Sequence, residues 1–214
     1  MAVSLPNGVL LAVATAYATA LTVTAASNAN PCVLTVTNTY TLGDIVEFTS
    51  GWSRANGRLF RLSAVTSTSV TLEGLDTSSI VQYPSTTGVG TLRKITAWTQ
   101  ITQIMGATSS GGDPQYQTYS FLEQDFDSQI PTTTSAQSIA LEIADDPLLA
   151  GYQAVRTIAL SRAATGLRAT LPAGGFIFYN GIFAFDETPS LTKGSLMSVK
   201  AGVALQNRPV RYAT

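Results

Sequence analysis

Hydrophobic and polar residues alternate with a period of two over several stretches in the second half of the chain. The clearest stretches are residues 139–144, 167–171 and 197–205. Successive side chains of a β-strand point to opposite faces of a sheet, so this alternation predicts strands with one buried face. Residues 176–185 are apolar at nearly every position, which predicts an interior strand covered on both faces.

The region 31–81 predicts a run of short strands separated by turns. Gly43-Asp44 and Asn56-Gly57 are turn signals, because Gly and Asn accept positive φ. Strands of about 4–6 residues at this spacing are typical of a small all-β barrel or sandwich. Residues 84–90 are rich in Ser, Thr and Gly and indicate a linker, so we expect a separable module that ends there.

Residues 95–104 predict one strand of about ten residues, which is long for a globular protein. An exposed edge of that length is normally protected by charge or proline, and this stretch has neither. We therefore expect its edge to pair with another subunit. Residues 106–114 follow as a mobile loop, and residues 116–121 predict a further short strand.

Asp145-Asp146-Pro147 is the best helix start in the sequence. An aspartate at position 146 can cap free backbone N–H groups, and proline suits the first helical position. Apolar residues then recur at helical spacing, which predicts a helix over about residues 147–160 with one buried face.

The predicted order is a series of strands, one helix and three further strands, without a repeating strand–helix–strand unit. This order predicts a mainly-β fold. We expect an N-terminal arm at residues 1–21, a small all-β module at residues 22–88, and a β-sandwich or barrel domain at residues 89–214 with one flanking α-helix.

Composition argues against most enzyme classes. The chain has 214 residues, of which 45% are hydrophobic and 12% charged, with 12 Lys and Arg against 13 Asp and Glu. It contains no histidine, the commonest general base and zinc ligand, and a single cysteine, Cys32. The near-neutral balance lacks the basic excess of an electrostatic nucleic-acid binder. The low charge fits a surface that copies of the chain cover, or an ordinary Thr-rich β-protein.

The apolar run at residues 9–20 resembles the core of a secretory signal, but no basic residue precedes it. No run reaches the roughly 18 continuous apolar residues that a membrane helix needs. We therefore expect a soluble protein that is intracellular when made.

Two motifs offer candidate chemistry, and each has a simpler interpretation. Ser190 and Lys193 match S-x-x-K, in which a lysine amine on one helix face activates a serine, but here the motif lies between two predicted strands. Glu123, Asp125 and Asp127 alternate as Ca²⁺ ligands can, yet the glycine and closing glutamate of an EF-hand loop are absent. A polar hairpin loop and a solvated loop edge are favoured.

Paired carboxylates and aromatic residues are the remaining candidates. Asp145-Asp146 and Asp186-Glu187 could serve glycoside hydrolysis only if the fold brought them together. Trp52, Trp98 and the tyrosines could stack on single-stranded nucleic acid, as platforms interleaved with Lys and Arg do. Arg54, Arg58 and Arg61 do lie close to Trp52, but they fall among strand and turn signals with acidic residues nearby. We expect no catalytic, cofactor or metal site.

The whole chain resembles the tail tube (major tail) proteins of long, flexible-tailed bacteriophages. The stretches that carry the resemblance are, in order, LPNGVLLAVATAYATALTVTAASNANP, TSGWSRANGRLFRL, LEGLDTSS, TLRKITAWTQITQI, GGDPQYQTYSFLEQDFDSQIPT, EIADDP and QNRPVRY. The segment around Asn30-Pro31, Gly43-Asp44 and Asn56-Gly57-Arg58 also resembles a small β-barrel module often inserted in phage virion proteins, which is similar to one found in ubiquitin-activating enzymes. That likeness is architectural and implies no ubiquitin chemistry.

The resemblance implies a structural virion protein of the phage tail, made in the cytoplasm of the host bacterium. It implies rings of six subunits whose inner sheets form a β-lined channel, stacked into a tube around a tape-measure protein. Tail terminator and tail tip proteins would be further partners, and DNA would pass through the lumen without sequence-specific binding. The family has no catalytic residues to transfer to this sequence.

Two expectations depend on this resemblance. Ring stacking should involve residues 1–20 and 106–114, and the lumen wall should be neutral to acidic, because clustered Lys and Arg would hold DNA phosphates. The alternative function is a secreted or periplasmic β-sandwich binding module, for example for carbohydrate. Such a module needs exposed aromatics on one sheet, whereas Phe176, Phe178, Phe183 and Phe185 are predicted core residues.

Overall fold

The computed structural model describes residues 7–213, which form strands and, within this range, a single α-helix. The helix α1 spans Ala150–Ser161. The strands are β1 Leu10–Tyr17, β2 Leu21–Val23, β3 Ala25–Ala26, β4 Cys32–Thr35, β5 Ile45–Ser50, β6 Arg58–Val65, β7 Ser69–Leu72, β8 Gly90–Ile101, β9 Ile104–Ser110, β10 Pro114–Tyr119, β11 Ser128–Thr134, β12 Ser138–Ala144, β13 Ala164–Thr170, β14 Phe176–Asp186, β15 Ser198–Leu205 and β16 Val210–Tyr212. The predicted mainly-β fold with one flanking helix is confirmed.

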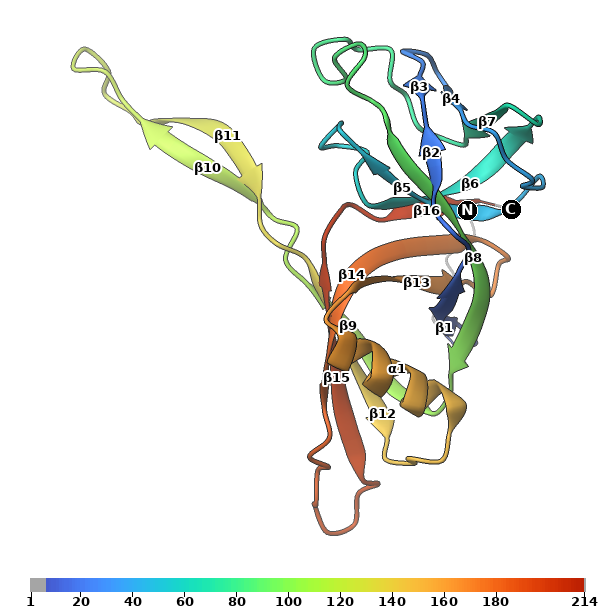
Figure 1. The fold of residues 1–214 in the computed structure, drawn as a ribbon. Helices are drawn as coiled ribbons and strands as arrows, with labels where there is room; N and C mark the ends of the chain where they lie inside the picture. The colour runs from blue at the N-terminus through green and yellow to red at the C-terminus, as the bar shows by residue number, and fades with distance from the viewer. Residues whose placement is uncertain (1–6, 214) are drawn as a thin grey trace.

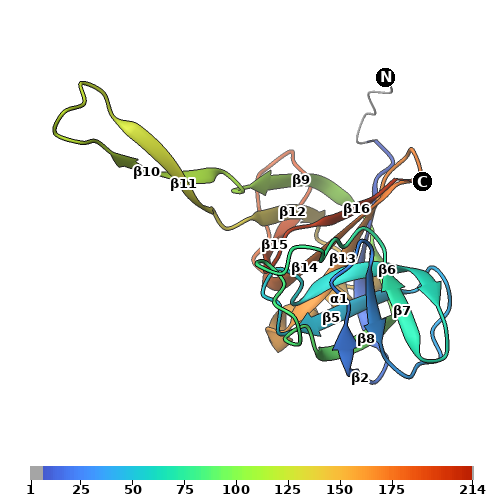
Figure 2. The same cartoon turned by 90° about the horizontal axis from the view of Figure 1, so that it is seen from above.

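Fourteen of the described strands belong to one strongly curved sheet (Figure 1). Its order is β3-β4-β7-β6-β5-β8-β1-β13-β14-β15-β12-β9, with β16 added beside β14 and β2 beside β8. Strands β10 and β11 form a separate two-stranded hairpin that projects far from the rest of the molecule, as both Figure 1 and Figure 2 show.

Two hydrophobic cores lie within the curve of the sheet. The first fills the small β-lobe of strands β2–β7 around Trp52, Phe48 and Phe60. The second lies between α1 and the strands β12–β15, where Tyr152 and Val155 of the helix pack on the sheet. Phe178 and Phe183 are buried and Phe176 and Phe185 are partly buried, so these aromatics belong to the cores as predicted.

The first core continues from the small lobe into the rest of the chain. Phe178, Val210 and Tyr212 pack with its residues. The Tyr212 hydroxyl accepts a hydrogen bond from the Arg61 N–H at 2.9 Å and donates to the Glu73 carbonyl at 3.2 Å. Burial raises the pKa of Tyr212 to about 12. Separate folding of residues 22–88 therefore stays a prediction, and removing them would uncover this aromatic cluster.

The expected N-terminal arm at residues 1–21 is wrong for its described part. Residues 10–17 form β1, which lies between β8 and β13 and pairs with both. Four consecutive residues, 11–14, are buried, because an interior strand covered on both faces is apolar on both. This explains why the segment resembles a signal core. No helix in residues 7–213 has the length and apolar character needed to cross a membrane.

The predicted strand over residues 95–104 is two strands. Strand β8 starts at Gly90 and ends at Ile101, and the positive φ of Gln103 (59°) turns the chain into β9. The expectation that its edge pairs with another subunit is also wrong, because β8 pairs with β1, β2 and β5 of its own subunit. The predicted mobile loop at residues 106–114 is mostly strand β9, which pairs with β12. Only residues Gly111–Asp113, between β9 and β10, lie outside the strands.

The helix begins three residues later than predicted. Asp146 and Pro147 form a turn in which the Asp146 carboxylate accepts a hydrogen bond from Leu148 N–H at 3.2 Å, and Leu149 precedes the helix without a side-chain cap. A close packing contact accompanies this late start. A Cβ on Gly151 would lie 2.5 Å from the Gln100 carbonyl oxygen and 2.8 Å from Ile101 Cα. Glycine therefore lets α1 lie directly on β8.

Replacing Gly151 with alanine should destabilise the protein, although alanine normally favours a helix by about 1 kcal/mol. The new methyl group would clash with the backbone of β8, and such overpacking costs about 1–3 kcal/mol. Chemical denaturation measures the change. Gly202→Ala is the control, because a Cβ there meets no heavy atom within 4 Å. Equal or greater stability of Gly151→Ala would contradict the close packing.

Candidate functional site

The residues that the sequence offers for catalysis lie in separate, mostly exposed places. Ser190 and Lys193 are exposed in the loop between β14 and β15, and neither is on a helix. Glu123, Asp125 and Asp127 are exposed in the turn between β10 and β11. Within residues 7–213, no three His, Cys, Asp or Glu side chains gather as metal ligands would.

One carboxylate of each acidic pair contacts the helix. The Tyr152 hydroxyl donates to Asp145 at 3.2 Å, and burial together with this carboxylate raises the pKa of Tyr152. One helical turn further, Arg156 Nε lies 2.7 Å from Glu187 Oε1 in an exposed ion pair. These contacts explain the acidic residues without catalysis.

The two tryptophans are engaged within the fold. Trp52 is buried, its Nε1–H donates to the Pro84 carbonyl at 2.8 Å, and its ring meets Tyr83 edge-on. Trp98 is half-buried, with the Arg168 guanidinium 4.8 Å from the centre of its ring. Neither presents the open aromatic face that base stacking needs.

Strand β9 has one edge without a strand partner in the described chain. The backbone groups of residues 137 and 145, which flank β12, point toward β15. Leu205 N–H donates a hydrogen bond to Gln137 O, and Asp145 N–H donates one to Met197 O. Alternate residues of β12, including Ala140, therefore bond toward β9, where Ala140 faces Thr108. Because neighbouring residues of a strand direct their N–H and C=O groups to opposite sides, those of Ala107 and Ser109 point away from the sheet.

The lower half of β14 offers a second free edge. Pairing with β13 ends at Ile182, so Phe183–Asp186 has no strand neighbour on that side within residues 7–213. A cleft of about 560 Å³ lies along this edge, lined on one side by Ile182–Phe185 and on the other by Arg156, Ala159, Leu160 and Arg162. Leu160 is 74% exposed, so the cleft has an apolar wall open to solvent.

These two edges bound four strands of the sheet, β14-β15-β12-β9, whose inner face packs in the second core with α1 and with residues of β1, β8 and β13. Its outer face carries mostly small or hydroxyl side chains, together with one row of charge across the strands and Ile182, which lies opposite Ala204 and is 37% exposed. The small residues are Gly106, Thr108, Ser110, Ser138, Ala140, Gly202, Ala204 and Ala184. The charged row is Glu142, Lys200 and Asp186, two carboxylates and one amine.

The β10–β11 hairpin is a third feature that monomer folding does not explain. Nearly all its residues are exposed, including Tyr116, Phe121, Leu122 and Phe126. A two-stranded hairpin alone in water is marginally stable, and exposed apolar groups of this size mark contact surfaces. Sequence reasoning identified a strand at 116–121 but missed the hairpin, since FLEQDFD suggests only a polar loop.

Comparison with known proteins finds a family model and solved structures that are similar to this chain. The family model described as phage tail tube protein, TTP, matches residues 50–214. Among solved structures, the tail of an empty gene transfer agent particle, refined with C6 symmetry, shares 12% identity over 54% of this chain and 87% of that chain, with a TM-score of 0.42. The virion of a native gene transfer agent particle shares 12% identity over 54% of this chain and 89% of that chain, with a TM-score of 0.41. No curated protein sequence matches the chain.

The family match spans well over half of the sequence and favours the tail tube interpretation over the secreted binding module. It agrees with the family resemblance carried by the sequence motifs. The chain belongs to the phage tail tube proteins, structural components of the virion tail.

Proposed function

We propose that copies of this chain close into a ring by pairing β9 of one subunit with the free edge of β14 in the next. The observation that carries this proposal is the presence of two free edges on one four-stranded sheet. All pairs in this sheet are antiparallel, so β9 and β14 run in opposite directions. Copies related by rotation alone would therefore meet as an antiparallel pair, and the interface is head-to-tail.

Six copies per ring is the number that the family resemblance implies. Six sheets of four strands would give a barrel of roughly 24 strands, about 50 Å across for strands about 4.8 Å apart and tilted about 40°. A barrel of this width has room for a DNA duplex. Closure also pairs the free edges of β9 and β14, which otherwise invite aggregation.

In such a ring the outer face of the four-stranded sheet would line the lumen, because its other face is buried in the second core. Its small side chains and its row of Glu142, Lys200 and Asp186 make a wall of net charge −1 per subunit. Because this wall has few cationic side chains, it would make few contacts to DNA phosphates, and DNA would move through the lumen without being held. A tape-measure protein would occupy the lumen before DNA, with tail terminator and tail tip proteins at the two ends. The proposal assigns no catalytic, cofactor or metal site.

The β10–β11 hairpin would join successive rings. It projects well away from the rest of its subunit (Figure 2). At the rise of a β-strand, residues 114–122 span a length of about 25–30 Å. This reassigns the expected stacking role of residues 106–114, because only Gly111–Asp113 at the hairpin root lie outside the strands.

Replacing residues 115–133 with Asn-Gly should leave rings but abolish tubes. The hairpin pairs with no other strand, so its removal should leave circular dichroism and the unfolding midpoint nearly unchanged. Asn-Gly forms the two-residue turn that joins antiparallel strands. Light scattering and negative-stain microscopy distinguish monomers, rings and tubes. Tubes of normal length from this variant would contradict the stacking role, and monomers alone from the unmodified chain would contradict ring closure.

A further inference from the structure

A cleft with three arginines lies where the small β-lobe meets the β15–β16 connection. Arg54, Arg58 and Tyr83 line it from the lobe, and Asn207 and Arg208 from the connection, around a volume of about 320 Å³. We refer to it as the arginine cleft. Within residues 7–213, none of its arginines forms an ion pair with a carboxylate.

The positive charge of the arginine cleft is uncompensated. The Arg58 guanidinium is stacked 5.1 Å from the centre of the Phe60 ring, and its buried Nε has no hydrogen-bond partner. Burial lowers the pKa of Arg58, and the charge of Arg208 lowers it further. A buried polar atom without a partner is unfavourable, so an anionic ligand would gain both charge and hydrogen bonds here.

The hairpin tip, residues 120–127, carries negative charge, opposite to that of the arginine cleft. Glu123, Asp125 and Asp127 are exposed and, within the described chain, outside any ion pair. They lie beside the exposed apolar side chains of Phe121, Leu122 and Phe126, and Leu122 is fully accessible at 104%. A surface of this mixture requires a partner that is both basic and apolar.

Exposed apolar side chains lie close in sequence to Tyr83, which lines the arginine cleft. Ile80 and Val81 precede Tyr83 by three and two residues and are 64% and 88% exposed. The turn that carries them is held by Tyr83 N–H, which donates to Ser79 O at 2.9 Å. The lobe therefore presents two large apolar side chains next to a positive cleft.

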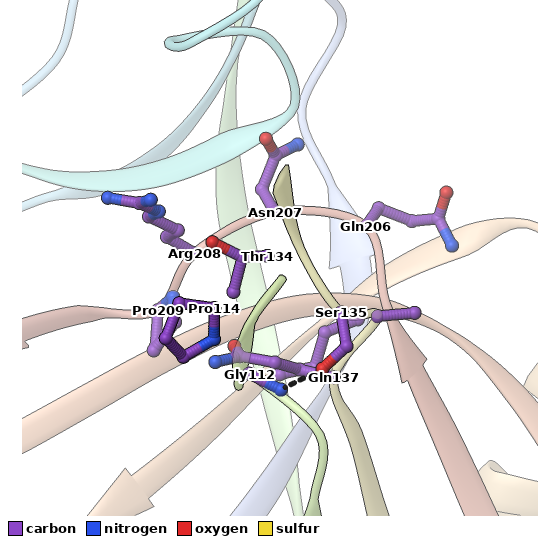
Figure 3. Close-up of a pocket in the computed structure, with 11 residues that line it drawn as sticks. Gly112, Pro114, Thr134, Ser135, Gln137, Gln206, Asn207, Arg208 and Pro209 are labelled. Atoms are coloured by element: carbon purple, nitrogen blue, oxygen red, sulfur yellow. Dashed lines mark hydrogen bonds between the residues drawn. The ribbon is translucent and has the colours of Figure 1, made fainter. Parts of the chain in front are cut away.

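The two complementary surfaces lie at opposite ends of the hairpin. Figure 3 shows Asn207 and Arg208 beside Pro114 and Thr134, where the hairpin leaves the domain. The tip lies far from this root in both views of the molecule (Figures 1 and 2), so it does not reach its own cleft. Copies displaced by about the length of the hairpin would bring each tip to the next root, an arrangement that repeats without closing.

We propose that the hairpin tip of each subunit docks into the arginine cleft of a subunit in the neighbouring ring. Carboxylates of the tip pair with the arginines of the cleft, and Phe121, Leu122 or Phe126 covers Ile80 and Val81. This proposal rests on the proposed tube and names the surface that receives the hairpin.

A charge exchange in the full chain tests the pairing. Arg54→Glu with Arg208→Glu should give rings without tubes, since like charges would then face each other. Glu123→Lys with Asp125→Lys and Asp127→Lys should have the same effect, and combining the two sets should restore tubes. Both exchanged arginines are exposed, so folding should be unaffected. Arg211→Glu, an exposed charge reversal outside the cleft, is the control and should form tubes.

A second measurement does not require tubes. A disulfide-closed peptide spanning residues 118–129 should bind the unmodified chain, and the double arginine variant should bind it at least tenfold more weakly. Normal tubes from both charge-reversed variants, or equal peptide binding by the arginine variant, would overturn the docking. Binding of inorganic phosphate at the cleft without peptide binding would also overturn it. Failure of the unmodified chain to form rings would instead refute the proposed function, while the peptide titration still decides the docking.

Discussion

Proline at position 107 should abolish ring closure while leaving the folded subunit intact. The N–H of Ala107 points away from β12, so its loss breaks no hydrogen bond within the subunit. Proline is tolerated on an edge strand when its nitrogen faces solvent. In a ring the same change leaves a carbonyl of the neighbouring β14 without its donor, at about 1–3 kcal/mol per interface. Because every interface of the ring carries the change, we expect assembly to be lost at any practical concentration.

Two neighbouring substitutions separate this effect from general damage. Ala107→Val keeps the N–H and favours a strand, so rings should form normally. Thr108→Pro removes an N–H that points toward β12, so it should lower the stability of the monomer itself. Light scattering gives the mass of each species, and thermal unfolding gives its stability. Normal rings from Ala107→Pro would show that β9 is not the joining edge.

Lysine at position 140 should turn a passive channel into one that holds DNA. Ala140 lies on the outer face of the four-stranded sheet between Thr108 and Gly202. Six new ammonium groups would ring the lumen at one level and release counterions from DNA. With 6–10 phosphate contacts, affinity falls by about 10³–10⁵ between 50 and 200 mM salt. We expect assembled Ala140→Lys tubes to retain duplex DNA at low salt and to release it steeply as salt rises.

Ala140→Gln is the matched control, since it adds a side chain of similar length without charge. Filter binding or electrophoretic retention of labelled duplex measures the difference, with tube length checked by microscopy. If Ala140→Lys tubes retained no more DNA than Ala140→Gln tubes, this face would not line the channel.

The sequence was sufficient to predict elements whose burial is regular. Residues 139–144 and 198–205 alternate because one face packs in the second core. Residues 176–185 are mostly apolar, but only 176–182 pair with β13, and Phe183–Asp186 lies at the free edge. Strand β1 was misread as an arm because it is buried on both faces. A short run that is buried on both faces carries no period, so local pattern alone cannot separate it from a targeting segment.

The joining edges and the hairpin depend on contacts between distant residues. Strand β9 has glycine and small polar residues with weak intrinsic preference for strands, and its conformation comes from pairing with β12, about 30 residues later. The arginine cleft combines residues near 54 and 83 with residue 208, which no local motif links. The sequence shows the carboxylates at residues 123–127, but it does not predict that they lie at the tip of a long hairpin, away from the rest of the subunit.

An electron cryomicroscopy map of tubes assembled from the unmodified chain tests the central proposal most directly. We expect a continuous antiparallel barrel in which Ala107 and Ser109 of one subunit bond to β14 of the next, with Ala140, Ala184 and Gly202 facing the lumen. A tube whose subunits join through other strands, or whose channel is lined by the helix α1, would contradict it.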